Sequence, residues 1–145
     1  MEVYTIGFAR KSAEEFFGLL RKAGIRRLID IRLNNSSQLA GFTKCGDLPF
    51  FLRKLCGADY RHEPLLAPTA ELLSHYKKRV VGWDEYEQQF LALLKERRVA
   101  KRLERTLFET PAVLLCSEPT AKRCHRRLVA EYLQRAWGDV SIVHL

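Results

Sequence analysis

Short apolar segments alternate with longer amphipathic segments along this chain. The apolar segments are typical of strands buried on both faces of a parallel sheet, and the amphipathic ones of helices that cover it. We expect strands at residues 3–6, 28–31, 60–63, 112–116 and 140–145. We expect helices from Ser12 to Gly24 and at residues 48–55, 69–78, 83–98 and 121–137. This alternation predicts an α/β fold: a single compact domain over residues 1–145, with a mostly parallel sheet of about four to five strands and helices on both faces.

Local signals support several of these boundaries. Ser12 and Glu15 have the spacing of a capping box, and Gly24 is typical of the residue that follows a helix. The apolar face of the 83–98 helix recurs at intervals of three and four residues: Trp83, Tyr86, Phe90 and Leu94. Basic residues 95–105 either extend that helix or follow a break in it.

Length and cysteine content narrow the class of protein. A chain of 145 residues is long enough for one hydrophobic core, and no apolar run approaches the roughly 20 residues of a membrane span. The first seven residues read as an opening strand rather than a signal peptide. The four cysteines, at positions 45, 56, 116 and 124, form no C-x-x-C pair. We therefore expect reduced thiols and a cytoplasmic location, with no membrane association.

The net charge of +8 favours polyanionic partners. The basic residues are spread along the chain, however, and they do not alternate with aromatic residues as a base-stacking surface would require. Basic residues on helices usually form a solvated face. The charge therefore permits nucleic-acid binding without indicating it.

The segment with the most chemical content links the 112–116 strand to the helix after it. The strand ends in Cys116, which is followed by Glu118, and the helix opens with Cys124, His125 and Arg126. Strand ends that face helix starts are where open α/β sheets build their sites. Helical spacing places His125 near the middle of the apolar face in the first turn, where burial and the helix dipole are expected to lower its pKa. The alternative is a structural histidine bonded to a nearby carbonyl.

Several chemistries can be weighed for these residues. Cys116 is either a stabilised thiolate nucleophile or a small buried core residue. Glu118 is either an acid or base, or a carboxylate favoured by the helix dipole. A cysteine-phosphatase loop is excluded, because Lys122 stands where an arginine is needed and residues 117–123 contain no glycine. Cys116, Cys124 and His125 match no standard zinc spacing, so we expect neither a metal nor a cofactor.

A second polar pair follows the 28–31 strand. Asp30 and Arg32 project to one face at the carboxyl edge of the predicted sheet. They form either a buried staple or a site in which Arg32 holds a carboxylate or phosphate. The polar loop at residues 34–42, with a candidate hinge at Gly41, is either a lid or a simple connection.

These segments occur in an order that resembles one family. They are Thr5-Ile6-Gly7-Phe8, Leu28-Ile29-Asp30-Ile31-Arg32, Tyr60 with Pro64-Leu65, Trp83 with Tyr86, and Leu114-Leu115-Cys116-Ser117-Glu118 with Cys124-His125-Arg126. Together they are similar to the family catalogued as domain of unknown function 488. The resemblance implies an α/β fold with the motifs at one sheet edge and no established reaction. It carries the family's polar positions onto Asp30, Arg32, Cys116, Glu118, Cys124, His125 and Arg126. Ala9 and Leu33-Asn34-Asn35 depart from the common family pattern.

The sequence thus predicts a polar pocket at the carboxyl ends of the strands that binds a small anionic or nucleotide-like ligand. Arg32 and Arg126, with Asp30 and Cys124 beside them, would hold the ligand. Glu118 or His125 would move protons, and Cys116 would act as nucleophile or line the site. A metal-independent hydrolase or transferase would fit. The alternative is a non-catalytic module that binds nucleic acid or protein through its basic helices.

Overall fold

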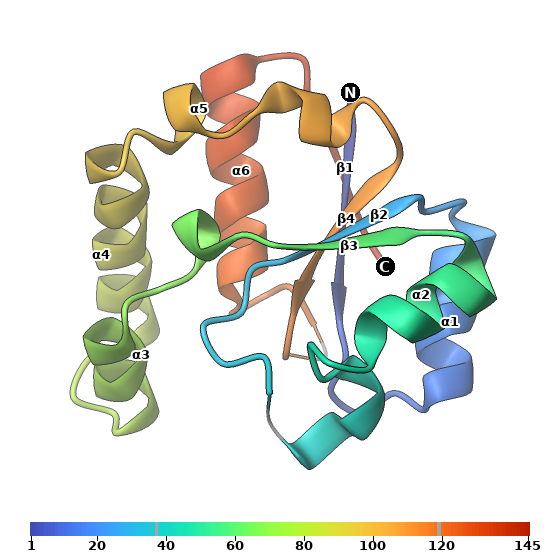
Figure 1. Ribbon diagram of the computed structural model, residues 1–145. Coiled ribbons are helices and arrows are strands. Elements are labelled where there is room, and N and C mark those ends of the chain that lie inside the picture. Colours follow the sequence, from blue (N-terminus) through green and yellow to red (C-terminus); the bar gives the residue numbers. More distant parts are fainter. Residues whose placement is uncertain (37, 119) are drawn as a thin grey trace.

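The protein is described by a computed structural model that covers residues 1–36, 38–118 and 120–145, with the backbone alone at residues 38–40. Its centre is a five-stranded sheet (Figure 1). The strands are β1 (Glu2–Gly7), β2 (Arg27–Asp30), β3 (Asp59–His62), β4 (Ala112–Cys116) and β5 (Ser141–His144). They are all parallel and lie in the order β3-β2-β4-β1-β5. The predicted parallel α/β fold is confirmed.

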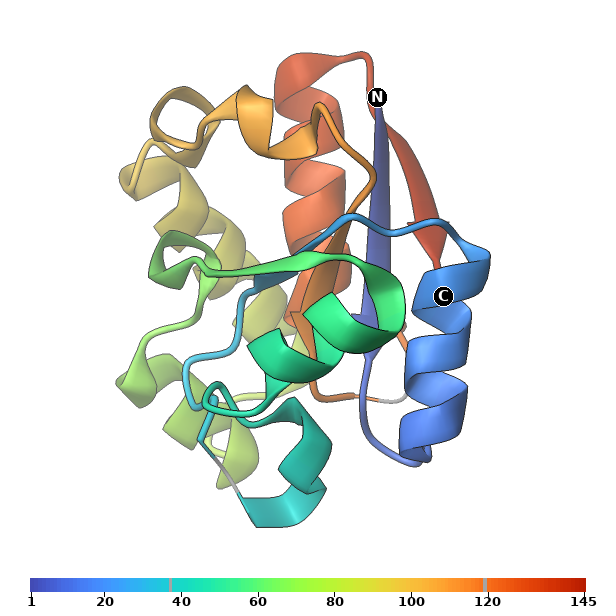
Figure 2. The ribbon, with the colours of Figure 1, turned by 45° about the vertical axis from the view of Figure 1, so that its right-hand side comes forward.

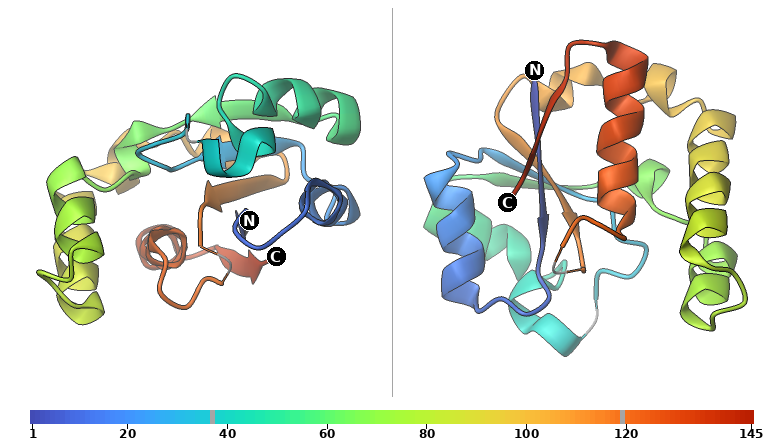
Figure 3. Two further views of the ribbon diagram at one scale, coloured as in Figure 1. Left: turned by 90° about the horizontal axis from the view of Figure 1, so that it is seen from below. Right: turned by 180° about the vertical axis from the view of Figure 1, so that it is seen from behind.

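Helices cover both faces of the sheet (Figures 2 and 3). One face carries α1 (Ala13–Lys22) and α2 (Leu48–Cys56). The other carries α6 (His125–Trp137) and α4 (Trp83–Glu96), with α3 (Ala70–Lys77) and α5 (Val99–Arg102) packed beside them. Short 3-10 turns occupy Gln38–Thr43, Pro64–Leu66 and Arg105–Phe108. No helix in the described part of the chain is long and apolar enough to cross a membrane.

The core is divided by the sheet because successive strand residues point to opposite faces. In β4 every residue is buried. Ala112 and Leu114 join the core under α4 and α6, whereas Val113 and Leu115 join the core under α1 and α2. This continuous burial explains why β4 reads as an uninterrupted apolar run. The edge strands β3 and β5 are largely exposed, which fits their mixed sequences.

Most predicted elements are confirmed to within two residues. The capping box of Ser12 and Glu15 is present at the start of α1. The helix at 83–98 ends at Glu96, and Arg98 takes a left-handed conformation with φ of 55° before α5 begins. Of the two alternatives for residues 95–105, the break is therefore the one observed.

The start of α6 was predicted wrongly. The expected helix at 121–137 begins only at His125, because Cys124 is the N-cap with an extended backbone (φ −138°, ψ 140°). Cysteine is not a usual capping residue, and its side chain makes no capping hydrogen bond here. No local signal therefore marked the true start. The correction places the Cys124 side chain before the helix instead of within its first turn.

Candidate functional site

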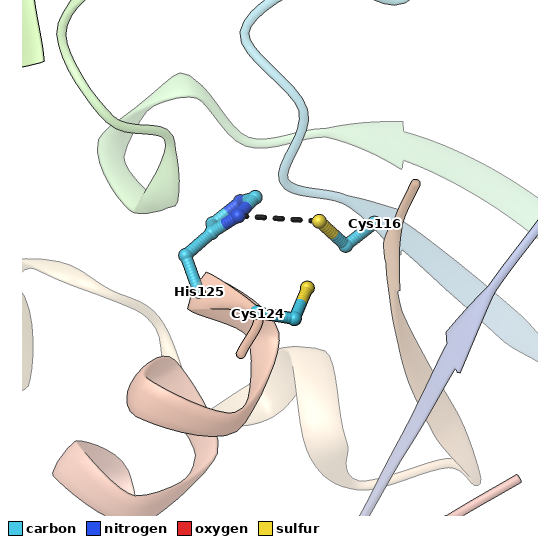
Figure 4. Close-up of side chains that lie close together, drawn as sticks. All are labelled: Cys116, Cys124 and His125. Atoms are coloured by element: carbon cyan, nitrogen blue, oxygen red, sulfur yellow. Dashed lines mark hydrogen bonds between the residues drawn. The ribbon is translucent and has the colours of Figure 1, made fainter. Parts of the chain in front are cut away.

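Three strand ends meet at the carboxyl edge of the sheet. In the register, Gly7 of β1 lies opposite Cys116 of β4, and Asp30 of β2 lies opposite Leu115. The backbone N–H of Ile31 donates to the carbonyl of Leu115 at 3.2 Å, which extends the pairing of β2 and β4 past Asp30. Helix α6 begins beside this edge (Figure 4). Residues far apart in the sequence thus meet at one place.

Cys116 and His125 form a buried pair at this edge. The Sγ atom of Cys116 lies 3.2 Å from Nδ1 of His125 (Figure 4), and the two residues are 3% and 8% exposed. The other ring nitrogen, Nε2, lies 2.9 Å from the backbone carbonyl of Ile31. Since a carbonyl can only accept, Nε2 carries a hydrogen and donates it. Nδ1 of the neutral ring is then a lone-pair acceptor that faces the thiol, which is the arrangement needed to take its proton.

The electrostatics of the pair favour a thiolate beside an imidazolium. Burial raises the pKa of Cys116, but the neighbouring Cys124 thiol and the charge and hydrogen bond of His125 outweigh burial and bring that pKa well below its ordinary value. Burial lowers the pKa of His125, but the charge and hydrogen bond of Cys116 outweigh it and raise that pKa. The expectation of a lowered histidine pKa was therefore wrong. It considered the helix end and burial but not a thiolate partner.

Cys124 lies next to this pair. Its thiol is buried, and the neighbouring Cys116 sulfur, followed by burial, raises its pKa. The donor atoms of Cys116, Cys124 and His125 all lie within 4.8 Å of one another. Two sulfurs and one imidazole are ligands that a soft metal ion accepts. Within the described residues no fourth histidine, cysteine or carboxylate belongs to this group. The sequence placed these three residues at one edge of the sheet, but their spacing matches no standard zinc pattern.

Arg126 lies behind the thiols. It is 1% exposed, its Nη1 donates to the carbonyl of Glu118 at 2.6 Å, and the same nitrogen is 4.0 Å from Sγ of Cys124. Its Nε atom is buried without a hydrogen-bond partner. Gly7 makes room for this arrangement, because a Cβ there would lie 1.6 Å from the Glu118 carbonyl oxygen and 2.4 Å from Nη1 of Arg126. A buried cation therefore stands next to the cysteines, where the close approach requires glycine.

Asp30 and Arg32 form a closed polar network beside the thiols. Nε and Nη2 of Arg32 donate to the two carboxylate oxygens of Asp30 at 2.8 and 2.9 Å. Arg32 also donates to the carbonyl of Thr43 at 2.5 Å, and its guanidinium lies over the Phe8 ring at 5.4 Å from the centroid. The hydroxyl of Tyr60 donates to Asp30 at 2.6 Å. The contacts of Asp30 are therefore with groups of the protein itself, as expected if the Asp30–Arg32 pair is structural.

A cavity of about 340 Å³ opens onto this edge. Cys116, Cys124, His125 and Arg32 line it, together with the exposed side chains of Glu118, Arg123 and Lys77. Neither Asp30 nor Arg126 is among its lining residues. The structure thus brings five of the seven predicted site residues to one cavity, whereas the other two do not line it.

One wall of the cavity is aromatic, and the sequence interpretation did not assign it to the site. Tyr76, Trp83 and Tyr86 pack against one another with ring centroids 4.8 to 5.8 Å apart, and Phe8 lines the cavity as well. Helical periodicity marked Trp83 and Tyr86 as core residues, which is correct for the buried Tyr86 but incomplete. Leu33 and Asn34 also line the cavity, whereas Ser37 of the predicted lid loop lies outside the described residues.

The fold and this site define a class: α/β proteins with a buried cysteine–histidine pair at the carboxyl edge of a parallel sheet. Residues 12–133 match the family described as "Domain of unknown function DUF488", and the chain belongs to that family. The expected family membership is confirmed. Searches of curated proteins and of solved structures find no significant match.

Proposed function

We propose that this protein is a thiol-dependent enzyme that binds a small anionic ligand in the cavity and acts on it through the Cys116 thiolate. One observation carries the proposal: Sγ of Cys116 lies 3.2 Å from Nδ1 of His125, at the wall of a cavity of about 340 Å³. A thiolate, not a thiol, is the nucleophile in cysteine chemistry. A cysteine that only fills space needs neither an imidazole nor access to a cavity.

His125 has two roles in this proposal. It holds the proton of Cys116 while the thiolate attacks an electrophilic carbon or phosphorus, and it returns that proton to the leaving group. The Ile31 carbonyl keeps Nδ1 directed at the sulfur through both steps, because it requires a hydrogen on Nε2. The reaction class is a metal-independent hydrolysis or group transfer.

The cavity wall suggests the kind of ligand. Lys77 and Arg123 supply positive charge, Glu118 is the lining carboxylate, and the charge of Arg32 is already paired with Asp30. The aromatic rings of Tyr76, Trp83 and Tyr86 supply a flat apolar surface. Pockets of this kind orient a ligand by a few charged groups and enclose an apolar body. An anion with a planar apolar part, such as a nucleotide, satisfies both. The free thiols favour a reducing compartment, so we infer a cytoplasmic location.

The first experiment measures the alkylation rate of each cysteine against pH by mass spectrometry, with neutral iodoacetamide and anionic iodoacetate. We expect Cys116 to titrate with an apparent pKa below the roughly 8.5 of a free thiol. His125→Gln should raise that apparent pKa, because the charge and hydrogen bond of the imidazole help to lower it. Cys56 is the internal control, since burial raises its pKa.

The comparison of iodoacetate with iodoacetamide tests whether the cavity favours an anion. We expect iodoacetate to be favoured over iodoacetamide at Cys116, and the double variant Lys77→Gln/Arg123→Gln to reduce that preference. The matched control is Arg98→Gln/Lys101→Gln, which removes the same charge from exposed residues that do not line the cavity. An equal effect of the two double variants would overturn the proposal that the cavity binds the anion, and it would favour the basic helices as the binding surface. Salt-dependent RNA binding that only the control pair weakens would also favour them.

A second candidate rests on the cluster of Cys116, Cys124 and His125, whose donor atoms lie within 4.8 Å. Elemental analysis of the purified protein precedes alkylation. A stoichiometric soft metal that blocks alkylation until a chelator is added would replace the thiolate proposal with a metal site. Alkylation that a chelator leaves unchanged supports the thiolate. Cys116 that reacts only when the protein unfolds would overturn the proposal.

A further inference from the structure

Cys124 has no role in the proposed reaction, although it is buried beside the nucleophile. It is 2% exposed, lines the same cavity as Cys116, and its sulfur lies within 4.8 Å of the Cys116 sulfur. As the N-cap of α6 its side chain makes no capping bond. In Figure 4 both sulfurs point into the space between β4 and the start of α6. A second thiol in that place calls for an explanation.

The two thiols differ in their protonation. Sγ of Cys116 lies 3.2 Å from Nδ1 of His125, which can take its proton, whereas the neighbouring Cys116 sulfur raises the pKa of Cys124. Dithiol chemistry uses this asymmetry, because one sulfur attacks as a thiolate and the other is held in reserve as a thiol.

We propose that Cys116 and Cys124 form a reversible dithiol–disulfide couple, oxidised by small hydroperoxides, at the wall of the cavity. The proposal goes beyond the proposed function and rests on it only for the nucleophilic Cys116 thiolate. The couple would give the protein a second chemistry at the same site. While the disulfide is closed, Cys116 is not a nucleophile.

The reaction has two balanced steps. The Cys116 thiolate attacks one oxygen of the hydroperoxide, the O–O bond breaks, and the leaving alkoxide takes the proton of the His125 imidazolium. Cys116 is then a sulfenic acid. Cys124 next loses its proton to the neutral His125, and its sulfur attacks the Cys116 sulfur. The S–O bond breaks, the S–S bond forms, and hydroxide leaves as water with that proton. Two thiols supply two electrons, and two external thiols, or one dithiol, restore them and are themselves oxidised to a disulfide.

The surroundings suit this closure. A disulfide bond is about 2.0 Å long, so the sulfurs must approach each other by rotation about the Cα–Cβ bonds. Cys116 is the last residue of β4 and Cys124 directly precedes α6, so both lie at the ends of regular elements. The positive charge of Arg126, 4.0 Å from Sγ of Cys124, helps that thiol to ionise during the second step.

The test treats the reduced full-length protein with hydrogen peroxide and maps disulfides by mass spectrometry. We expect a Cys116–Cys124 disulfide that dithiothreitol reverses, and a matching loss of Cys116 alkylation. Cys124→Ser is the informative variant, because serine is close to cysteine in size but cannot form a disulfide. In it we expect a sulfenic acid at Cys116 that dimedone traps.

The outcomes separate this inference from the proposed function. If Cys116 has a lowered apparent pKa but peroxide yields no Cys116–Cys124 disulfide, the proposed dithiol–disulfide couple is wrong. The proposed role of Cys116 as a nucleophile is then unaffected. If Cys116 in the folded wild type is inert to alkylation and peroxide, both are wrong. Should Cys124→Ser fail to fold, Cys116→Ser gives the complementary test: Cys124 alone should resist peroxide. Oxidation of Cys124 in that variant would overturn the assigned order of attack.

Discussion

The carboxyl edge of the sheet holds two buried arginines with opposite surroundings. Arg32 is 6% exposed and forms a two-pronged ion pair with Asp30, which also accepts from Tyr60. Arg126 is 1% exposed and has a backbone carbonyl as its oxygen partner, while its Nε finds no hydrogen-bond partner among the described residues. The first charge is neutralised by a carboxylate. The second forms no ion pair within the described part of the chain, and Sγ of Cys124 lies 4.0 Å from its Nη1.

This difference indicates different roles for the two arginines at this edge of the sheet. A buried ion pair with satisfied hydrogen bonds fixes the position of the strands that carry it, and breaking it leaves a costly unpaired charge. A buried cation without a carboxylate favours negative charge nearby, including thiolates. The Asp30–Arg32 network therefore has a structural role, whereas Cys116, Cys124, His125 and Arg126 form the part of this edge to which we assign the proposed chemistry.

The largest effect expected is the loss of stability in Arg32→Met. Removal of the guanidinium leaves Asp30 buried without its cation, which costs about 3–5 kcal/mol in comparable cases. Urea denaturation measures it. Asp59→Ala is the matched control, because the Arg27–Asp59 pair is a two-pronged pair of the same kind with the aspartate 55% exposed, and it should cost about 1 kcal/mol or less. Similar losses in both variants would show that Asp30–Arg32 is no more than a surface-like pair.

Tyr60→Phe should have an intermediate effect. It removes the 2.6 Å hydrogen bond to Asp30, and bonds to charged groups contribute about 1.5–3 kcal/mol. Burial, followed by the hydrogen bond and charge of Asp30, raises the pKa of Tyr60. A raised pKa gives stability that is complete below about pH 10, the unfolded value, and is lost as the pH rises through the folded value. The stability gap between wild type and variant should therefore shrink at strongly alkaline pH. A gap that does not change with pH would contradict this.

Arg126→Met should change stability least. The variant loses one hydrogen bond but also removes a buried charge that has no carboxylate partner, so we expect a change within about 1 kcal/mol. Its effect should appear instead at the thiols: the charge of Arg126 lowers the pKa of Cys124, and its loss should raise that pKa further. Denaturation and cysteine alkylation measure the two effects. A loss as large as that of Arg32→Met would contradict this and would mean that the surroundings of Arg126 compensate its charge as fully as Asp30 compensates that of Arg32.

The elements were predictable where their signals are local. The capping box of Ser12 and Glu15 and the apolar run of β4 depend on neighbours in the sequence, and both are confirmed. The strand order β3-β2-β4-β1-β5 depends on pairing between distant segments, so the local pattern did not contain it. The start of α6 was missed for a related reason, since an unusual N-cap gave no signal.

The sequence indicated which residues meet at the candidate site, but not the direction of the His125 pKa shift. The position of Cys116 at a strand end and of His125 at a helix start indicated one edge, and the structure brings them to 3.2 Å. The direction of the His125 pKa was predicted wrongly because it depends on the charge of a side chain nine positions away. The place of Tyr60 beside Asp30 depends on the pairing of β2 with β3, which periodicity does not reveal.

The hydrogen bond between the Ile31 carbonyl and His125 has a consequence for mutational scanning. The group that orients the imidazole belongs to the backbone, so every amino acid at position 31 keeps it. A complete substitution scan would therefore report position 31 as a packing site, where only the volume of a buried side chain matters. Chemical synthesis could expose the role of the carbonyl: an ester between Ile31 and Arg32 makes it a weaker acceptor while both side chains stay.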